Sequence, residues 1–255
     1  MIRKFPEVTG RLKYGVSNYT KNLTEVAGRL SATATRHAKK WLAELLPSDA
    51  KYWKAYARFI KVLGESTDWN LMVNLITEKL NLKETDVVLE AGCGNGLWIS
   101  KIIGKVAKVI GIDGTQEMLD AARVTTLNNK KVELQVVDLN KGTLPFPDES
   151  FDKISHTLVL GYLSKDGREK ILKEFYRVLK DGGSIAIATP IKGASFFKIL
   201  QEEARRKQSE GTFWKNISKL PLGMTAITFG KIAELKDWTG QYHFYTNEEL
   251  KADLE

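Results

Sequence analysis

The sequence predicts an α/β fold with a doubly wound parallel sheet. Two observations predict it: apolar runs with strand character alternate with helical patterns, and a glycine-rich turn follows the first run. The five runs lie at residues 86–91, 107–112, 132–137, 152–157 and 184–189. Strands that alternate with helices form parallel sheets with right-handed crossovers. Such sheets bind ligands beyond the carboxyl ends of their strands, near the point where the strand order reverses, so we expect a site at that edge.

The turn after the first predicted strand has glycines at alternating positions. Gly92, Gly94 and Gly96 form this pattern, and Asp113 follows 21 residues after Gly92, at the end of the second apolar run. Glycines let the backbone approach a ligand closely, and a carboxylate at the end of the next strand can accept both hydroxyl protons of a ribose. The spacing therefore predicts a cofactor that contains a nucleoside.

The position of the third glycine indicates which class of cofactor binds. A dinucleotide fingerprint has its third glycine three residues after the second, but Leu97 occupies that position here. Glu90 precedes the first glycine by two residues. A carboxylate there would be unfavourable beside a pyrophosphate and favourable beside a cationic group, so a cofactor with a cationic end is expected.

The segment from Glu90 to Gly96 resembles the first motif of the class I S-adenosylmethionine-dependent methyltransferases, an acidic residue followed by alternating glycines. Residues 111–119 are similar to the second strand and following helix of that family. Residues 136–154 are similar to its third strand, loop and fourth strand, and residues 175–188 to its next helix, glycine turn and fifth strand.

The resemblance implies a Rossmann-like methyltransferase core with S-adenosyl-L-methionine as its cofactor. Asp113 would then hold the ribose, and Asp138 would face the adenine amino group. The residues predicted to bind the cofactor are Glu90, Gly92, Gly94, Gly96, Asp113, Gly114, Met118, Asp138 and Leu139. No metal site is predicted.

The chain of 255 residues is long enough for one α/β domain with additional segments. We expect an N-terminal basic helical extension or lid at 1–84 and a cofactor-binding core at 85–190. The remaining residues, 191–255, are expected to supply a helical part of the substrate pocket and the C-terminal part of the core. Thr246 and Glu249 match a capping box, which predicts a helix to the end of the chain.

The family adds an antiparallel hairpin of two strands after the fifth strand, and this hairpin is absent from the sequence. The fifth strand would therefore present an unpaired edge. Either the chain has been shortened, or another segment or subunit covers that edge.

Most of the net charge of +8 lies near the N-terminus. Residues 1–40 contain nine basic side chains and only two acidic ones, Glu7 and Glu25. Apolar residues recur at helical spacing from Leu12 to Leu30. Two interpretations remain open: an amphipathic helix packed on the catalytic domain, or a segment attracted to an anionic membrane surface or an acidic substrate. Nucleic acid is the least favoured partner.

Residues 41–80 predict two or three helices that are rich in aromatic side chains. The aromatic residues are Trp41, Tyr52, Trp53, Tyr56, Phe59 and Trp69, and Leu63 shares a helical face with Tyr52, Tyr56 and Phe59. In the family, helices before the first strand often form a lid over the cofactor. The aromatic side chains are interpreted either as ordinary core or as part of a pocket for a bulky apolar or aromatic acceptor.

Methyl transfer from a sulfonium is an in-line displacement, so the protein can contribute mainly by alignment and desolvation. Where the acceptor has to lose a proton, His156, at the end of the fourth strand, is the candidate catalytic base. The alternative is that His156 only lines the cofactor pocket through its backbone. Tyr162 is a weaker candidate base.

The residues after the fourth predicted strand narrow the acceptor class. Residues 156–161 lack the motif of enzymes that methylate base amino groups, and the chain also lacks the motifs of pyrimidine-carbon and protein-arginine methylation. A small or lipid-like acceptor remains, as in the group that includes quinone and sterol methyltransferases. A nicotinamide oxidoreductase and a cofactor-binding scaffold without catalysis are the alternatives.

Cys93 is the single cysteine, so no internal disulfide is expected. The sequence has no secretory signal and no apolar run long enough to span a bilayer. We therefore expect a cytoplasmic protein, with the option of peripheral attachment to the inner membrane surface.

Overall fold

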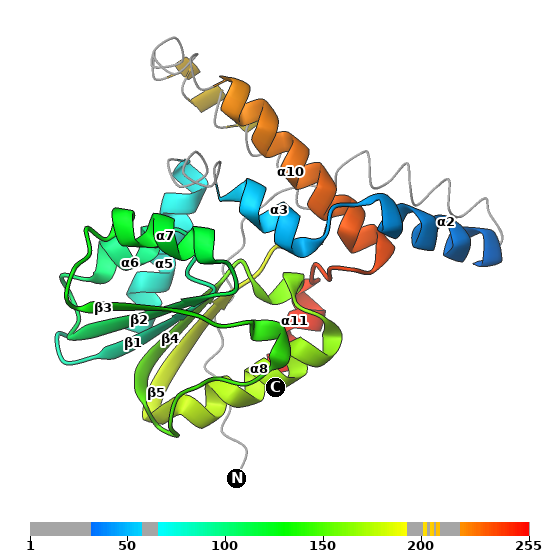
Figure 1. The fold of residues 1–255 in the computed structure, drawn as a ribbon. Coiled ribbons are helices and arrows are strands. Elements are labelled where there is room, and N and C mark those ends of the chain that lie inside the picture. Colours follow the sequence, from blue (N-terminus) through cyan, green and yellow to red (C-terminus); the bar gives the residue numbers. More distant parts are fainter. Residues whose placement is uncertain are drawn as a thin grey trace.

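The computed structural model describes residues 32–57, 66–192, 201–202, 205–206, 208–209 and 220–254. A five-stranded sheet forms the centre of this part of the chain (Figure 1). Its strands are β1 (Val87–Ala91), β2 (Lys108–Asp113), β3 (Val132–Val136), β4 (Phe151–Thr157) and β5 (Leu179–Ala188). The helices are α2 (Ala32–Leu45), α3 (Asp49–Tyr56), α5 (Thr67–Leu80), α6 (Leu97–Ile102), α7 (Gln116–Thr125), α8 (Lys165–Val178), α10 (Leu220–Thr239) and α11 (Asn247–Leu254), with short 3-10 turns η1 (Leu139–Lys141) and η2 (Leu160–Tyr162).

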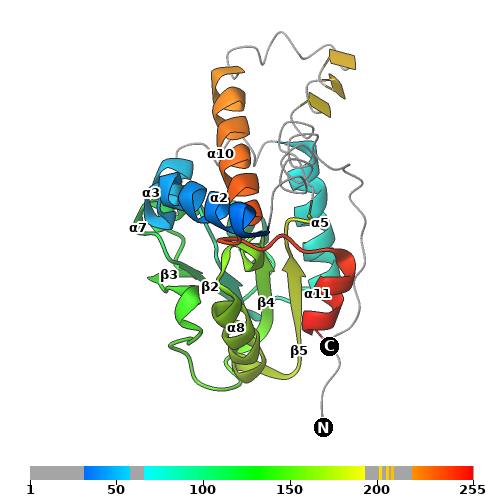
Figure 2. The same cartoon turned by 90° about the vertical axis from the view of Figure 1, so that its right-hand side faces the viewer.

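The strand order is β3-β2-β1-β4-β5, and every neighbouring pair is parallel. Helices α5, α6 and α7 cover one face of the sheet and α8 covers the other (Figures 1 and 2). The order reverses between β1 and β4, so the crevice beyond their carboxyl ends is the expected ligand site of such a fold. The predicted doubly wound α/β class is confirmed.

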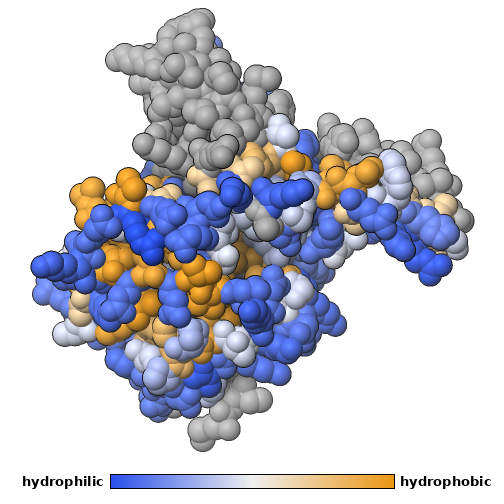
Figure 3. Space-filling model, viewed as in Figure 1, coloured by the Kyte–Doolittle hydropathy of each residue, from blue (hydrophilic) through white to orange (hydrophobic). Residues whose placement is uncertain are grey.

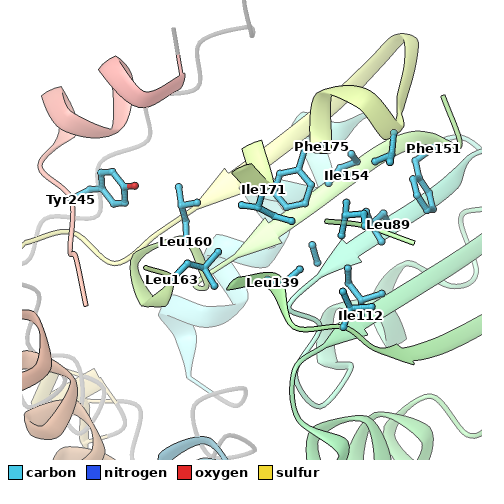
Figure 4. Close-up of a cluster of buried hydrophobic side chains, with 14 residues drawn as sticks. Leu89, Ile112, Leu139, Phe151, Ile154, Leu160, Leu163, Ile171, Phe175 and Tyr245 are labelled. Atoms are coloured by element: carbon cyan, nitrogen blue, oxygen red, sulfur yellow. The ribbon is translucent and has the colours of Figure 1, made fainter. Parts of the chain in front are cut away.

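Both faces of β1 are buried, which explains why all of its residues except Glu90 are apolar. Leu89 and Ala91 face α8 in a core that also contains Phe175, and Figure 4 shows this cluster with its labelled side chains. Val88 belongs to the core on the opposite face, together with Val73 of α5. Because side chains alternate along a strand, Glu90 lies on the same face as Val88.

The fifth strand begins earlier than the sequence predicts. Residues 181–183 were expected to form a turn, but β5 follows α8 directly at Leu179. Two steps along β4 correspond to five along β5, since Phe151 pairs with Leu179 and Lys153 with Ser184. Gly182, with a left-handed φ of 75°, lies within this bulge. The glycines therefore bend the strand instead of preceding it.

In the described part of the chain β5 pairs only with β4, so β5 is an edge strand as expected. After β5, Ile191 forms an isolated parallel bridge with Tyr245. The capping box at the start of α11 is confirmed: Thr246 N donates to Glu249 Oε2 at 2.8 Å, and Glu249 N donates to Thr246 Oγ1 at 3.2 Å.

The helices α2, α3 and α10 lie beyond the carboxyl ends of the strands (Figure 1). The Tyr52 hydroxyl of α3 donates to the Phe229 carbonyl of α10 at 3.2 Å, and Lys236 of α10 forms an ion pair with Asp49 at 2.6 Å. Segments from the two ends of the chain thus meet over the sheet. The predictions for residues 1–31, Phe59 and Leu63 lie outside the described residues. Among the helices that are described, none is both long and apolar enough to cross a membrane.

Candidate active site

The glycine turn after β1 is held in a conformation that glycine favours. Gly92, Gly94 and Gly96 have positive φ angles of 82°, 52° and 73°. A Cβ atom on Gly92 would lie 2.3 Å from Val159 Cγ2, and one on Gly96 would lie 3.0 Å from the Ala122 side chain. The turn therefore fits tightly between α7 and the loop after β4, with no room for larger residues at Gly92.

Asp113, at the end of β2, fixes this turn through its carboxylate. Oδ2 accepts the N–H of Gly94 at 3.0 Å, and Oδ1 accepts the N–H of Thr115 at 2.9 Å. Burial raises the pKa of Asp113, and these two hydrogen bonds oppose the rise. Each carboxylate oxygen can accept a further hydrogen bond, which is the capacity that a pair of ribose hydroxyls requires.

Glu90 supplies a second carboxyl group on the α5 side of the sheet. Its side chain is 4% exposed, and Oε2 is buried without a hydrogen-bond partner among the described residues. Burial raises the pKa of Glu90 well above its ordinary value, and the nearby charge of Asp113 adds to the rise. A buried polar oxygen without a partner is costly, so a ligand that brings a cation or a hydrogen-bond donor fits this position.

The other predicted cofactor residues lie along the same edge. Val137 N donates to the Asp113 carbonyl at 2.9 Å, which brings the end of β3 beside the end of β2. Asp138 then caps η1 by accepting the N–H of Asn140 at 3.0 Å. Met118 and Leu139 are buried, whereas an added Cβ on Gly114 would meet only one atom, at 3.8 Å. Packing therefore does not require glycine at position 114.

His156 lies on the opposite face of the sheet from Glu90. The side chain is fully buried, and Nδ1 lies 2.8 Å from the Ala91 carbonyl, so Nδ1 carries the proton and donates it. The ring is 5.0 Å from that of Phe175 in α8. Burial lowers the pKa of His156 to about 4. A general base has to reach the proton that it accepts, and this buried geometry does not favour that role. The ring instead supports the end of β1 from the core, a role that neither prediction for His156 described.

Two features of the site were not singled out by the sequence analysis. Leu158, directly after β4, has a φ of 57° although it is not glycine, and its N–H donates to the Ala188 carbonyl at 2.7 Å. A left-handed conformation costs about 1–2 kcal/mol for such a residue. This turn directs the chain so that Val159 contacts Gly92. No sequence signal marks Leu158, because its side chain is an ordinary apolar one.

The second feature is Arg177 of α8, which holds the loop after η1. Its guanidinium donates to the carbonyl of Phe146 at 2.8 Å and to that of Leu144 at 3.1 Å, and forms ion pairs with Glu174 and Asp148. The arginine precedes the Leu-Lys-Asp-Gly-Gly segment that carries part of the family resemblance. That motif was a usable signal for this residue.

Comparisons with known proteins agree with this geometry. The sequence family described as "Methyltransferase domain" matches residues 88–183. A demethylmenaquinone methyltransferase from Lactobacillus johnsonii is 33% identical over 129 residues, covering 49% of this chain and 51% of that protein. A demethylmenaquinone methyltransferase from Oceanobacillus iheyensis is 31% identical over 111 residues, covering 42% and 46%. The chain thus spans about half the length of these curated relatives.

Among solved structures, the YcgJ protein of Bacillus subtilis is 27% identical. The match covers 47% of this chain and 50% of that chain, with a TM-score of 0.44. This similarity is too loose to carry an argument about function.

Proposed function

We propose that this chain, which belongs to the class I S-adenosylmethionine-dependent methyltransferase family, transfers a methyl group from S-adenosylmethionine to a small or lipid-like acceptor. One observation carries the proposal. The left-handed glycine turn, the Asp113 carboxylate and the unpartnered Glu90 oxygen converge at the carboxyl ends of β1 and β2. The residues present fit a nucleoside cofactor with a cationic end.

Each of these groups has a role that follows from its chemistry. The Asp113 carboxylate would accept hydrogen bonds from the two ribose hydroxyls, and Glu90 offers a carboxylate to the cationic end of the cofactor. Asp138 stands beyond β3, where it would face the adenine amino group. Gly92, Gly94 and Gly96 allow the left-handed backbone of the turn that would face the cofactor, and Gly114, Met118 and Leu139 complete the proposed site.

When bound, S-adenosylmethionine supplies an electrophilic methyl group on a sulfonium that leaves in an in-line displacement. The protein then has to align the acceptor with that methyl group and exclude water. His156 is proposed to contribute indirectly: its hydrogen bond to the Ala91 carbonyl holds the last residue of β1 at the base of the glycine turn. A proton released by the acceptor is not expected to pass to this buried ring.

A lipid-like acceptor is supported by the relatives, since both are named demethylmenaquinone methyltransferases. Their name refers to a quinone. We therefore propose an acceptor with a ring or an apolar body, bound on the side of the crevice that α3 and α10 cover.

Equilibrium titration with S-adenosylhomocysteine and, separately, with NAD tests the cofactor. S-adenosylhomocysteine should bind, and Asp113→Ala should weaken its binding by about 1.5–3 kcal/mol, the range for hydrogen bonds to a charged group. Binding of NAD alone would favour an oxidoreductase. Incubation with labelled methyl donor and cell extract then tests turnover, because cofactor binding without transfer of label to any fraction would indicate a scaffold.

We also propose that the N-terminal basic region attaches peripherally to an anionic membrane surface, on the cytoplasmic side. Its described part, α2, has no buried residues and exposes Trp41 and Leu45, at 64% and 61%, beside Arg36 and Lys40. Figure 3 shows apolar and hydrophilic surface side by side over α2. Such a face fits the interface of a bilayer that carries anionic lipids.

Co-sedimentation with phosphatidylglycerol vesicles tests this attachment, with phosphatidylcholine vesicles as the control. We expect binding to the anionic vesicles that falls with salt and with Trp41→Ala. Equal recovery with both lipids, or no recovery with either, would contradict the membrane proposal and leave the methyltransferase proposal intact.

A further inference from the structure

An aromatic cluster lies where the N-terminal and C-terminal segments meet. Its rings come from α3, from η2, from α10 and from the segment before α11. They are Tyr52, Trp53, Tyr56, Tyr162, Phe229, Tyr242 and Phe244. The Tyr162 ring lies at its centre, with ring centroids 4.9 Å from Trp53, 4.9 Å from Tyr242 and 5.7 Å from Phe244, all edge-on.

The loop after β4 connects this aromatic cluster to the glycine turn. Val159 packs against Gly92, and Tyr162 follows only three residues later in the same loop. The Gly161 carbonyl accepts the N–H of His243 at 2.7 Å, which fixes the loop against the C-terminal segment. The cluster therefore begins at the carboxyl end of β4, beside the proposed cofactor site.

Helix α3, which contains part of the aromatic cluster, contacts α7. Lys54 of α3 forms an ion pair with Glu117 of α7 at 2.7 Å, and Glu117 directly precedes Met118 of the proposed cofactor site. Three of the aromatic side chains belong to α3, so this ion pair brings the cluster beside the helix that carries Met118. Figure 1 shows α3 in this position, between α7 and α10.

The four tyrosine hydroxyls of the cluster differ in their hydrogen bonds. The hydroxyl of Tyr52 donates to the Phe229 carbonyl at 3.2 Å, and that of Tyr242 donates to Asp49 at 2.8 Å. Within the described part of the chain, no hydrogen bond reaches the hydroxyl of Tyr56 or Tyr162, and neither oxygen is among the fully buried atoms that lack a partner, so both are accessible to a ligand or a water. Burial raises the pKa of both, so each keeps its proton at neutral pH and can donate it.

We propose that the aromatic cluster binds a planar aromatic acceptor that carries a hydroxyl or carbonyl oxygen on its ring, and that Tyr56 and Tyr162 donate hydrogen bonds to that oxygen. Aromatic side chains provide apolar contact area for a ring, and a hydroxyl without a partner inside such a cluster gains a hydrogen bond only from a ligand or a water. The inference rests on the proposed function, because it places the acceptor beside the proposed methyl donor.

The test uses the full chain and two probes that differ by one oxygen, 1-naphthol and naphthalene. The protein is first titrated with S-adenosylhomocysteine, and each probe is then titrated into the saturated protein. Tyr56→Phe and Tyr162→Phe should each weaken 1-naphthol binding by about 2- to 12-fold, the effect of one neutral hydrogen bond, and leave naphthalene binding unchanged. Tyr176→Phe is the matched control, since Tyr176 lies on α8, is 50% exposed and is outside the cluster.

The outcomes separate the two proposals. Failure of S-adenosylhomocysteine to bind would overturn the proposed function. If that ligand binds but 1-naphthol affinity does not respond to either variant, the aromatic cluster only packs α3 against α10 and this inference is wrong. An equal loss for 1-naphthol and naphthalene would also overturn it, because the hydroxyls would then act through packing.

Discussion

The two sides of the crevice are built in different ways. On the side of β1 and β2, backbone groups and short polar side chains from neighbouring loops make the site: Gly94 N and Thr115 N both bind Asp113. On the side of α3 and α10, large side chains from distant segments make it, and Tyr52 bonds to Phe229 across 177 residues of sequence. The first side is suited to one constant ligand. On the second side, substitutions can alter the shape of the site without disturbing the sheet, and different acceptors would require different shapes.

The largest expected effect is on the free energy of unfolding and concerns the glycine turn on the side of β1 and β2. Gly92→Val should lower the free energy of unfolding by about 2–5 kcal/mol, because a left-handed β-branched residue is strained and its side chain would overlap Val159. Urea unfolding measures this loss. Gly104→Ala is the control, since no atom lies within 4 Å of an added Cβ there, and it should leave the free energy of unfolding nearly unchanged. Equal stability of the two variants would contradict the close packing at Gly92.

The next prediction concerns the charge of Glu90. The raised pKa means that the folded protein keeps this proton while the unfolded chain has lost it, so in the ligand-free protein this residue lowers stability as pH rises above about 4.5. Glu90→Gln should remove that loss. The difference in unfolding free energy between variant and wild type should grow with pH, and a difference that is constant from pH 4 to pH 8 would contradict the prediction.

The ionisation of Glu90 should make ligand affinity rise with pH, whereas it makes the stability of the ligand-free protein fall. A cationic ligand group favours the ionised carboxyl, so S-adenosylhomocysteine should bind the wild type more tightly as pH rises, whereas Glu90→Gln should bind weakly with a flatter pH profile. Titration calorimetry at several pH values measures both. The same profile in both proteins would show that another group is responsible.

A smaller loss of stability is expected when the contact between α3 and α10 is weakened. Asp49 accepts hydrogen bonds from Lys236, which is 1% exposed, and from Tyr242. Asp49→Ala leaves the buried Lys236 ammonium without its carboxylate, while the 55% exposure of Asp49 weakens the pair, so we expect a cost of about 1.5–3 kcal/mol of stability. Proteolysis near α3 should become faster, and S-adenosylhomocysteine affinity should stay constant. A large loss of that affinity would show that the two sides of the crevice are coupled.

The smallest loss of stability is expected when the ion pair between α3 and α7, which joins the two sides, is removed. Lys54 and Glu117 form their ion pair with side chains that are 61% and 42% exposed. Exposed pairs contribute about 0–1 kcal/mol, so Lys54→Ala should leave the urea midpoint nearly unchanged. A shift as large as that of Asp49→Ala would show that α3 is held equally firmly on both sides.

The local geometry on the side of β1 and β2 could be predicted because its signals lie close together in the sequence. Gly92 has the left-handed conformation of the predicted turn, Asp113 accepts a hydrogen bond from that turn, and Thr246 with Glu249 marked the start of α11 in the same way. The meeting of Tyr56 and Phe229 could not be predicted, because a helical pattern shows which face is apolar and not which partner covers it. The bulge at Gly182 was mistaken for a turn, since glycine permits both. His156 was placed at the correct strand end, but its burial beside Phe175 depends on α8.

Asp113 accepts hydrogen bonds from two backbone N–H groups, and these bonds affect the free energy of ligand binding. The N–H groups of Gly94 and Thr115 are already bonded in the ligand-free fold, so the turn is preorganised and its amide hydrogens should exchange slowly with solvent before any ligand arrives. The entropy of ordering this loop is then a cost of folding, and very little of it has to be met when the proposed nucleoside ligand binds.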